Sequence, residues 1–298
     1  MTVRLAVTLG DPRGIGPEIV AKALSLPLEA QVTLVGADDQ VGAIPAARRV
    51  PVGRWAGQGG AHRAGAIAGH AIEAAARLAL DGSVDAIVTA PASKQALQLA
   101  GFAFPGHTEM LAHLAGGVDV AMMLASDRLR VVLVTTHVAL RDVPALLTAA
   151  AVVRTGTLAR SALHDWFGVA EPRLAVCALN PHAGEGGLFG DEDDRVLRPA
   201  AERLGAVGPL PADTVFLRAL RGEFDAVLAP YHDVGMTAIK VASFGSAVNV
   251  TLGLPFPRTS PDHGTALDIA GTDRADPSSM RRALELAATL GARARSRT

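Results

Sequence analysis

The 298-residue chain contains a single cysteine, Cys177, which excludes an internal disulfide and a thiolate metal cluster. Aromatic residues are only 4% of the chain, and no apolar run approaches the length of about 18 residues that a membrane-spanning helix requires. The 28 basic and 29 acidic residues nearly balance, and no basic stretch indicates a surface for nucleic acid or membranes. The N-terminus starts with a strand-like segment and lacks the pattern of a signal peptide. These absences predict a cytoplasmic protein that binds neither nucleic acid nor a membrane.

Two common nucleotide-binding signatures are also missing. Neither the Gly-x-Gly-x-x-Gly fingerprint nor a Gly-Lys-Ser/Thr phosphate loop occurs in the sequence. The first glycine-rich segment, Gly10-Asp-Pro-Arg-Gly-Ile-Gly-Pro-Glu18, has a different spacing. By itself it predicts only a tight turn that leads into a helix, with Pro17 in the first helical turn.

What the sequence does contain is a series of short apolar runs of Val, Ile, Leu and Ala, each of which stops at polar residues or at Gly or Pro. The runs are residues 5–9, 32–35, 86–90, 131–134, 174–179, 226–229 and 247–252. Ala-rich helical stretches, such as residues 69–80 and 143–163, lie between most of them. Strands that alternate with helices predict an α/β fold with a mostly parallel sheet covered on both faces, in one large or two medium domains. Ligands of such sheets bind beyond the carboxyl ends of the strands.

Three of these runs are followed by a histidine, namely His137, His182 and His232. One histidine after a strand is commonly a hydrogen-bonding loop residue, but three from one domain can converge on a divalent cation. Carboxylates stand nearby at Glu185, Asp213 and Asp233. They either orient the imidazoles or join the ligands, and the alternative for each is a helix N-cap or a surface acid.

Further segments contain candidates for binding an anion or a flat ligand. In Pro105-Gly-His-Thr-Glu109, either Thr108 caps a helix, or Thr108, the first backbone N–H groups and His107 bind an anion. Lys240, Asn249 and Arg258 lie in an otherwise apolar stretch, as solvated side chains or as ligands of a phosphate or carboxylate. Residues 262–271 combine a His-Gly turn with Gly271, which suits either an ordinary capped turn or close approach of the backbone to a flat ligand.

Taken in order, these segments resemble the 4-hydroxythreonine-4-phosphate dehydrogenase family of vitamin B6 biosynthesis. The matching segments are Gly10-Asp-Pro-Arg-Gly-Ile-Gly-Pro-Glu18, Phe104-Pro-Gly-His-Thr-Glu109, Thr135-Thr-His137, Leu179-Asn-Pro-His-Ala-Gly-Glu185, Gly208-Pro-Leu-Pro-Ala-Asp-Thr214, Tyr231-His-Asp233, Val248-Asn-Val-Thr-Leu-Gly-Leu-Pro255 and Arg258-Thr-Ser-Pro-Asp-His-Gly-Thr-Ala266. Most would be weak alone, but so many in order make the resemblance specific. It runs from Leu5 to about Ala275 without a large gap.

The resemblance implies the two-domain α/β fold of the isocitrate and isopropylmalate dehydrogenases, with mostly parallel sheets, helices on both faces and a central cleft. It predicts a terminal domain of residues 1–118 and 246–298 with the cofactor loop. A central domain of residues 119–245 is expected to carry the metal histidines and the dimer contacts. The family works as a homodimer whose active site is completed at the subunit interface.

The resemblance also assigns roles to residues of this sequence. His137, His182 and His232 match the metal ligands, with one Zn, Mg, Mn or Co ion per site. The substrate-binding positions match His107, Thr108, Lys240, Asn249 and Arg258. The nicotinamide-nucleotide loop, for NAD or NADP, corresponds to His263, Gly264, Thr265, Ala266 and Asp268. The candidate general bases are Lys240, Asp213 and Asp233.

The implied reaction is the NAD(P)-dependent oxidation of 4-phosphohydroxy-L-threonine and its decarboxylation to 3-amino-2-oxopropyl phosphate, in pyridoxine and pyridoxal phosphate biosynthesis. A sibling dehydrogenase acting on a tetronate 4-phosphate or a related hydroxy acid is the alternative. A metal-dependent phosphohydrolase, which needs no nicotinamide, is the alternative from another class.

The chain departs from the family pattern at Arg13, at Pro91-Ala-Ser-Lys94, and at Val234 and Met236. None of these departures removes a proposed ligand.

Overall fold

The computed structural model describes residues 2–244 and 246–296, and the chain divides into two compact units. Unit 1 comprises Met1–Asp119 and Leu254–Thr298, and unit 2 comprises Val120–Gly253. The return to unit 1 thus comes later than the predicted boundary at residue 246. The reason is that β10 (Val248–Leu252) pairs antiparallel with β5 (Ala121–Ala125) inside unit 2.

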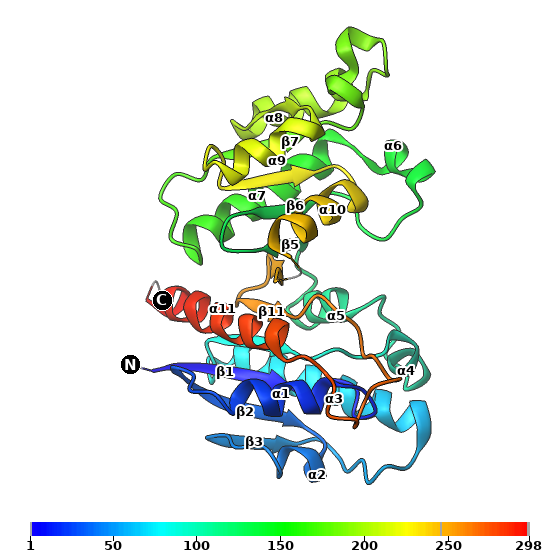
Figure 1. Cartoon of the computed structure of the whole chain (residues 1–298), viewed down its shortest axis with the longest axis vertical. Coiled ribbons are helices and arrows are strands. Elements are labelled where there is room, and N and C mark those ends of the chain that lie inside the picture. Colours follow the sequence, from blue (N-terminus) through cyan, green and yellow to red (C-terminus); the bar gives the residue numbers. More distant parts are fainter. Residues whose placement is uncertain (1, 245, 297–298) are drawn as a thin grey trace. The chain divides into compact units, whose positions relative to one another are not determined.

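Unit 1 contains a sheet of five parallel strands, drawn at the lower end of Figure 1. Their spatial order is β3 (Arg48–Pro51), β2 (Ala30–Gly36), β1 (Val3–Thr8), β4 (Ala86–Thr89) and β11 (Arg258–Ser260). All four residues of β4 are buried, as expected for a parallel strand that is covered on both faces. The carboxyl ends of β1 and β4 therefore lie side by side, followed by the glycine turn and by Pro91.

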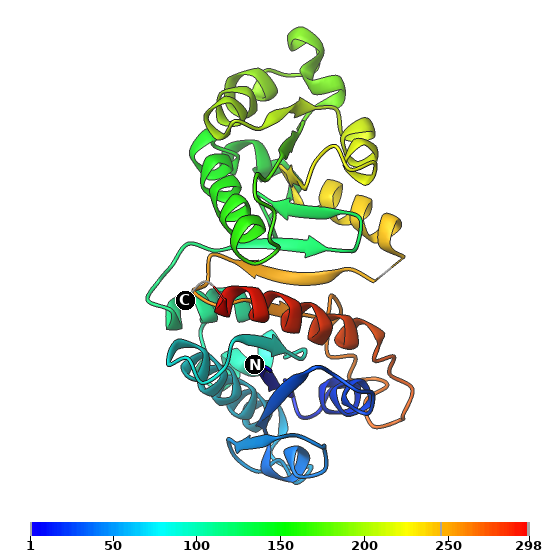
Figure 2. The ribbon, with the colours of Figure 1, turned by 90° about the vertical axis from the view of Figure 1, so that its left-hand side faces the viewer.

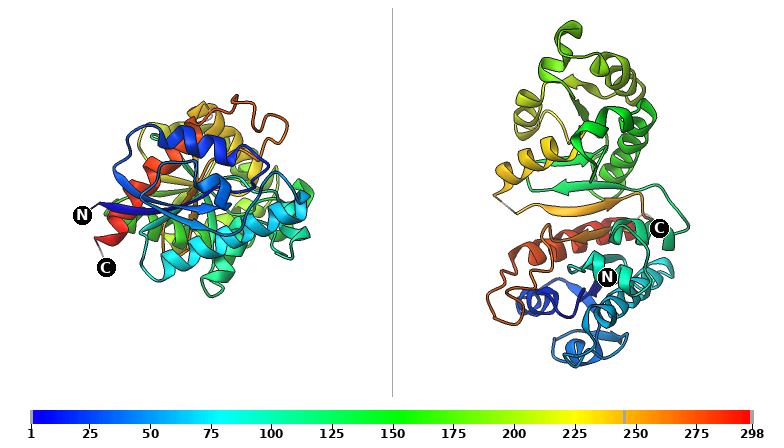
Figure 3. Two further views of the ribbon diagram at one scale, coloured as in Figure 1. Left: turned by 90° about the horizontal axis from the view of Figure 1, so that it is seen from below. Right: turned by 90° about the vertical axis from the view of Figure 1, so that its right-hand side faces the viewer.

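Helices cover both faces of this sheet. They are α1 (Gly16–Leu24), α2 (Asp38–Val41), α3 (Gly60–Leu80), α4 (Lys94–Leu99), α5 (His107–Leu114) and α11 (Ser278–Arg295). The left panel of Figure 3 shows α1 and α3 on opposite sides of the strands, and α11 packs against α1, β1 and β4. A Cβ atom at Gly65 would lie 1.8 Å from the carbonyl oxygen of Ala96, so only glycine lets α3 approach α4 this closely.

Unit 2 contains a mixed sheet. Its strand order is β10, β5, β6 (Arg130–Leu133), β9 (Ala226–Ala229), β7 (Leu174–Cys177) and β8 (Val207–Leu210). The strands from β6 to β8 are parallel, and β5 is antiparallel to both of its neighbours. The helices are α6 (Val143–Leu146), α7 (Ala149–Asp165), α8 (Arg198–Leu204), α9 (Ala212–Leu220) and α10 (His232–Ser243). Figure 2 shows α7 and α10 on opposite sides of these strands.

All seven predicted apolar runs contain strands, whereas β3, β5, β8 and β11 are absent from the predicted set. The predicted helix over residues 143–163 is interrupted at Leu147. There Thr148 caps α7, because its Oγ1 accepts a hydrogen bond from the backbone N–H of Ala151 (3.1 Å). Among the helices of the described residues, none is both long and apolar enough to cross a membrane.

Candidate functional site

The first cluster of functional side chains lies at the carboxyl ends of β6 and β9 in unit 2. The hydroxyl of Thr135 donates to the carbonyl oxygen of Pro230 (2.7 Å), which joins the two neighbouring strand ends. The rings of His137 and His232, which follow these strands, lie with their centroids 5.5 Å apart and their planes inclined at 45°. Two imidazoles at this separation are suited to binding a divalent cation between them.

A carboxylate orients the second of these rings. His232 begins α10, and its Nδ1 lies 2.7 Å from Oδ1 of Asp233. When Nδ1 donates its proton to the carboxylate, the lone pair of Nε2 is free to bind a metal. Asp233 thus occupies the position of an imidazole-orienting acid. Asp213, in contrast, is exposed in the first turn of α9.

His182 follows β7 but lies in an unusual backbone segment. The five residues from His182 to Gly186 all have positive φ, and three of them are not glycine. Such residues cost roughly 1 kcal/mol each, so surrounding contacts must hold the turn in place. Asp193 supplies one of them, because its buried carboxylate accepts the backbone N–H groups of Leu179 (2.8 Å) and Asn180 (3.0 Å). Nδ1 of His182 lies 2.9 Å from Oε2 of Glu185. When Nδ1 donates to this carboxylate, Nε2 of His182 has a lone pair for a metal ion.

The described part of the chain contains no group of three or more His, Cys, Asp or Glu side chains placed to hold a metal ion. His137 and His232 are brought together, and exposed His182 is not part of that pair. The pair fits two positions of a metal coordination sphere, and its nitrogen donors suit Zn, Co or Mn. A complete coordination sphere would need ligands in addition to these two rings.

The second cluster lies in unit 1 around Arg258. The side chain of Arg258 on β11 is only 3% exposed, and its Nε (3.1 Å) and Nη2 both donate to the hydroxyl of Thr89 at the end of β4. Burial lowers the pKa of Arg258 to about 10, and the charge of Glu109 acts in the opposite direction. The guanidinium therefore remains protonated at neutral pH, as a buried cation close to the end of a parallel strand.

His107 is next to this cation at the start of α5. Burial, together with the positive charges of Arg258 and Lys94, lowers the pKa of His107 to about 3, so the ring is neutral. Its Nε2 is buried and finds no hydrogen-bond partner among the described residues. The N-cap position is Gly106, which makes no side-chain cap, so of the two alternatives for Thr108 the helix cap is not formed. Thr108 instead lies in the first turn, beside backbone N–H groups that are free to bind an anion.

The other two predicted substrate residues belong to unit 2. Lys240 is exposed on α10, two turns after His232. Asn249 lies on β10 opposite Leu124, and its Oδ1 is buried without a hydrogen-bond partner within residues 2–244 and 246–296. A buried carbonyl oxygen without a donor is costly, which marks Asn249 as a candidate to meet a ligand.

The predicted cofactor residues lie in a long loop, residues 261–277, without helix or strand. The glycine turn holds one end of this loop, because the backbone N–H of Ile15 donates to the carbonyl oxygen of Thr265 (3.0 Å). Gly264 faces open space, so a flat ligand can approach the backbone there. Nε2 of His263 is buried and has no hydrogen-bond partner in the described structure. These features fit a nicotinamide nucleotide, with His263 and the Gly264–Thr265 backbone as its contacts.

Comparison with known proteins identifies the family to which the chain belongs. The model of the family described as "pyridoxal phosphate biosynthetic protein PdxA" matches residues 14–287. The chain belongs to the PdxA family. It is 44% identical to a 4-hydroxythreonine-4-phosphate dehydrogenase of Geobacter metallireducens, over 96% of this chain and 95% of the relative. It is 42% identical to a D-threonate 4-phosphate dehydrogenase of Salmonella typhimurium, over 97% of this chain and 99% of the relative.

A crystal structure of a 4-hydroxythreonine-4-phosphate dehydrogenase from Klebsiella pneumoniae has the same fold, with a TM-score of 0.89 at 39% identity and coverage of 98% of both chains. Membership of the PdxA family and the α/β fold are therefore confirmed. Sequence reasoning assigned no role to Thr89, to Asp193, or to Lys94, whose charge acts on His107. Only Thr89 had a local signal, its place at the end of an apolar run where ligand-facing residues gather.

Proposed function

We propose that this PdxA-family chain is a metal- and NAD(P)-dependent dehydrogenase that oxidises 4-phosphohydroxy-L-threonine and decarboxylates the product. The observation that carries the proposal is the buried Arg258 cation beside neutral His107, whose buried Nε2 has no hydrogen-bond partner among the described residues. Such a cluster is suited to one anionic end of a small phosphorylated acid. Relatives that align over nearly the whole chain are named for this activity.

The binding roles follow from the chemistry of each group. A guanidinium is a planar cation with five N–H donors, and that of Arg258, which lies against Thr89, would attract and bind phosphate or carboxylate oxygens. Thr108 and the first N–H groups of α5 would donate alongside it. His107, being neutral, would contribute a hydrogen bond without a charge. Lys240 and Asn249 are proposed as further contacts to the substrate.

A divalent cation bound by His137, His232 and His182 would act as a Lewis acid at the substrate hydroxyl. Asp233 and Glu185 keep the Nδ1 atoms of His232 and His182 occupied and their Nε2 atoms available. Because Asp233 is engaged in this way, we propose Lys240 or Asp213 as the base. The base would take the hydroxyl proton, and bound NAD(P)+ would supply the two-electron oxidant for carbon 3, so that the substrate becomes a 3-oxo acid.

Decarboxylation follows from the product of that oxidation. The bond between carbons 1 and 2 breaks, carbon dioxide leaves, and the electron pair is delocalised toward the 3-oxo group. Protonation of carbon 2 then gives 3-amino-2-oxopropyl phosphate. The cations that hold the substrate oxygens stabilise the negative charge that develops in this step.

The test is NADH formation with 4-phosphohydroxy-L-threonine, NAD and a divalent cation, compared with D-threonate 4-phosphate and with an EDTA-treated sample. We expect turnover of the threonine derivative, its loss with EDTA, and its return when cation is added. Faster turnover of D-threonate 4-phosphate would assign the alternative that the Salmonella relative's name suggests. If the chain binds neither of the two substrates and does not bind NAD, the proposal is wrong.

We further propose that the chain works as a homodimer and that His182 completes the metal site of the partner. The structure supports this because His182 is exposed, separate from the His137–His232 pair, and followed by exposed Leu188 and Phe189. Exposed apolar side chains beside a candidate ligand suit a subunit contact.

This arrangement makes a sharp prediction for mixed dimers. His137→Ala and His182→Ala homodimers should each be inactive. A heterodimer of the two, isolated with two different tags, contains one intact site and should recover about half of wild-type activity. If all three histidines acted within one subunit, the heterodimer would be as inactive as its parents.

A further inference from the structure

The nucleotide loop, residues 261–277, is long for a segment without helix or strand, and such loops are usually functional. Two of its non-glycine residues, Ala266 and Asp273, have positive φ. A loop with these features needs external contacts to remain in one conformation. The contact between Ile15 and Thr265 holds its first part, and a separate network holds its second part.

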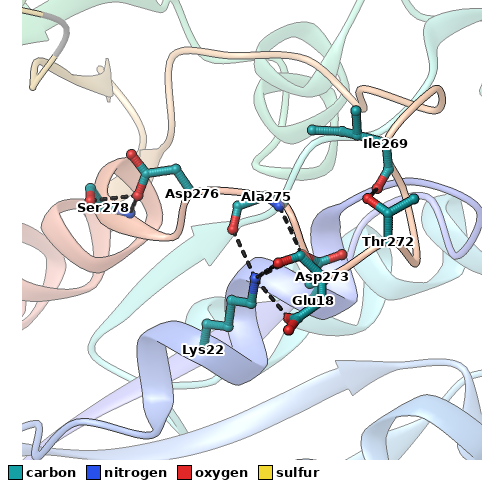
Figure 4. A network of polar contacts seen from close by, with 8 residues as sticks. All are labelled: Glu18, Lys22, Ile269, Thr272, Asp273, Ala275, Asp276 and Ser278. Atoms are coloured by element: carbon teal, nitrogen blue, oxygen red, sulfur yellow. Dashed lines mark hydrogen bonds and ion pairs between the residues drawn. The ribbon is translucent and has the colours of Figure 1, made fainter.

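Figure 4 shows this second network, in which the ammonium of Lys22 on α1 is surrounded by oxygen atoms from the loop. Nζ of Lys22 donates to the carbonyl oxygens of Asp273 (2.8 Å) and Ala275 (3.1 Å), and it lies 2.9 Å from Oδ1 of Asp273. Glu18, one turn earlier, accepts from Lys22 (2.9 Å) and from the backbone N–H of Ala275 (2.9 Å). Two side chains of one helix thus fix both a donor and two acceptors of the loop backbone.

The loop end is fixed by a local cap as well. The carboxylate of Asp276 accepts from the backbone N–H and the hydroxyl of Ser278, where α11 begins (Figure 4). The hydroxyl of Thr272 donates to the carbonyl oxygen of Ile269. These contacts are short-range and only shape the turns, whereas Lys22 and Glu18 connect the loop to a helix more than 250 residues earlier in the chain.

We infer that Lys22, supported by Glu18, is a positioning residue for the nicotinamide cofactor, which rests on the proposed role of the loop in binding it. Lys22 contacts no cofactor atom in this account. It holds residues 273–275, the second part of the loop, in the conformation that binds. An isolated Lys–Glu pair at i,i+4 spacing would only be a weak surface contact. Lys22 also donates to two carbonyl oxygens of the loop, and these hydrogen bonds fix the loop backbone to α1.

The expected effect of losing Lys22 on cofactor affinity follows from the populations of the loop conformations. If only a fraction of the molecules has the binding conformation, the apparent Kd for the cofactor rises in inverse proportion to that fraction. Losing the hydrogen bonds of the ammonium in Lys22→Met should therefore raise the Kd for NAD by about tenfold. The KM for NAD should rise similarly, while kcat at saturating NAD and the affinity for substrate remain unchanged.

The experiment combines calorimetric titration with NAD and hydrogen exchange of the cofactor-free protein. Lys22→Met should show weaker NAD binding and faster amide exchange confined to residues 262–277. Lys22→Arg keeps a cation with several donors and should remain close to wild type. Arg198→Met is the control, because Arg198 also forms an i,i+4 ion pair, with Asp194, but on the surface of unit 2 and away from the loop.

The outcomes separate this inference from the proposed function. If the wild-type chain fails to bind NAD, the dehydrogenase proposal is wrong, and hydrogen exchange still shows whether Lys22 anchors the loop. If NAD binds the wild type and Lys22→Met equally well, the positioning role is overturned, whatever the exchange rates. An Arg198→Met variant that weakens NAD binding as much as Lys22→Met would also overturn it, because the effect would then be one of general stability.

Discussion

Replacing Arg13 by alanine is expected to lower the free energy of unfolding by about 3 kcal/mol, an unusually large effect for one side chain in a turn. The reason is Asp11, which is fully buried behind the glycine turn. Nε and Nη2 of Arg13 donate to the two oxygens of Asp11 (3.0 and 2.8 Å), and the backbone N–H of Arg13 donates to one of them as well (3.0 Å). Removing the guanidinium leaves a buried carboxylate without its counter-charge.

A double variant separates this explanation from a general disturbance of the turn. In Asp11→Asn/Arg13→Ala there is no buried charge, so most of the stability should return. Urea unfolding of the wild type, both single variants and the double variant measures the coupling between the two residues. If Arg13→Ala alone unfolds like the wild type, the ion pair contributes nothing and the account is wrong. The pair also explains how this chain accommodates Arg13, its departure from the family pattern.

The second large effect is expected for Arg258→Met, which should lower catalytic efficiency without lowering stability. Arg258→Met should lower kcat/KM for the phosphorylated substrate by at least about 100-fold, since a buried, charge-assisted contact to an anion is lost. The melting temperature should stay the same or rise. Burial lowers the pKa of Arg258, so the folded state holds this proton less tightly than the unfolded state, and the charge destabilises the fold at neutral pH.

Arg258→Lys provides the control. It keeps the charge but loses the planar fork that contacts Thr89, so kcat/KM should fall by an intermediate amount. Melting temperature and steady-state kinetics of both variants, at several phosphate concentrations, make the comparison. A lower melting temperature for Arg258→Met together with unchanged kcat/KM would mean that Arg258 is a structural residue and that the anion binds elsewhere.

The two halves of the candidate site differ in how far local sequence predicts them. His137 and His232 follow apolar runs that form neighbouring parallel strands, so their meeting could be expected from strand alternation alone. His182 follows the adjacent strand β7 and looks equivalent in sequence. His182 lies in a left-handed turn beside the residues held by Asp193 and is not part of the pair, and no local pattern indicates six consecutive positive φ values.

The sequence by itself determined the α/β class, the family and the identities of the candidate ligands, because apolar periodicity and ordered motifs are local properties. Tertiary structure alone decided that β10 belongs with β5, that Thr89 holds Arg258, and that Lys22 reaches the loop at Asp273. Each of these contacts joins residues more than 100 positions apart. Such pairings depend on how strands and helices pack, and short-range propensities do not predict them.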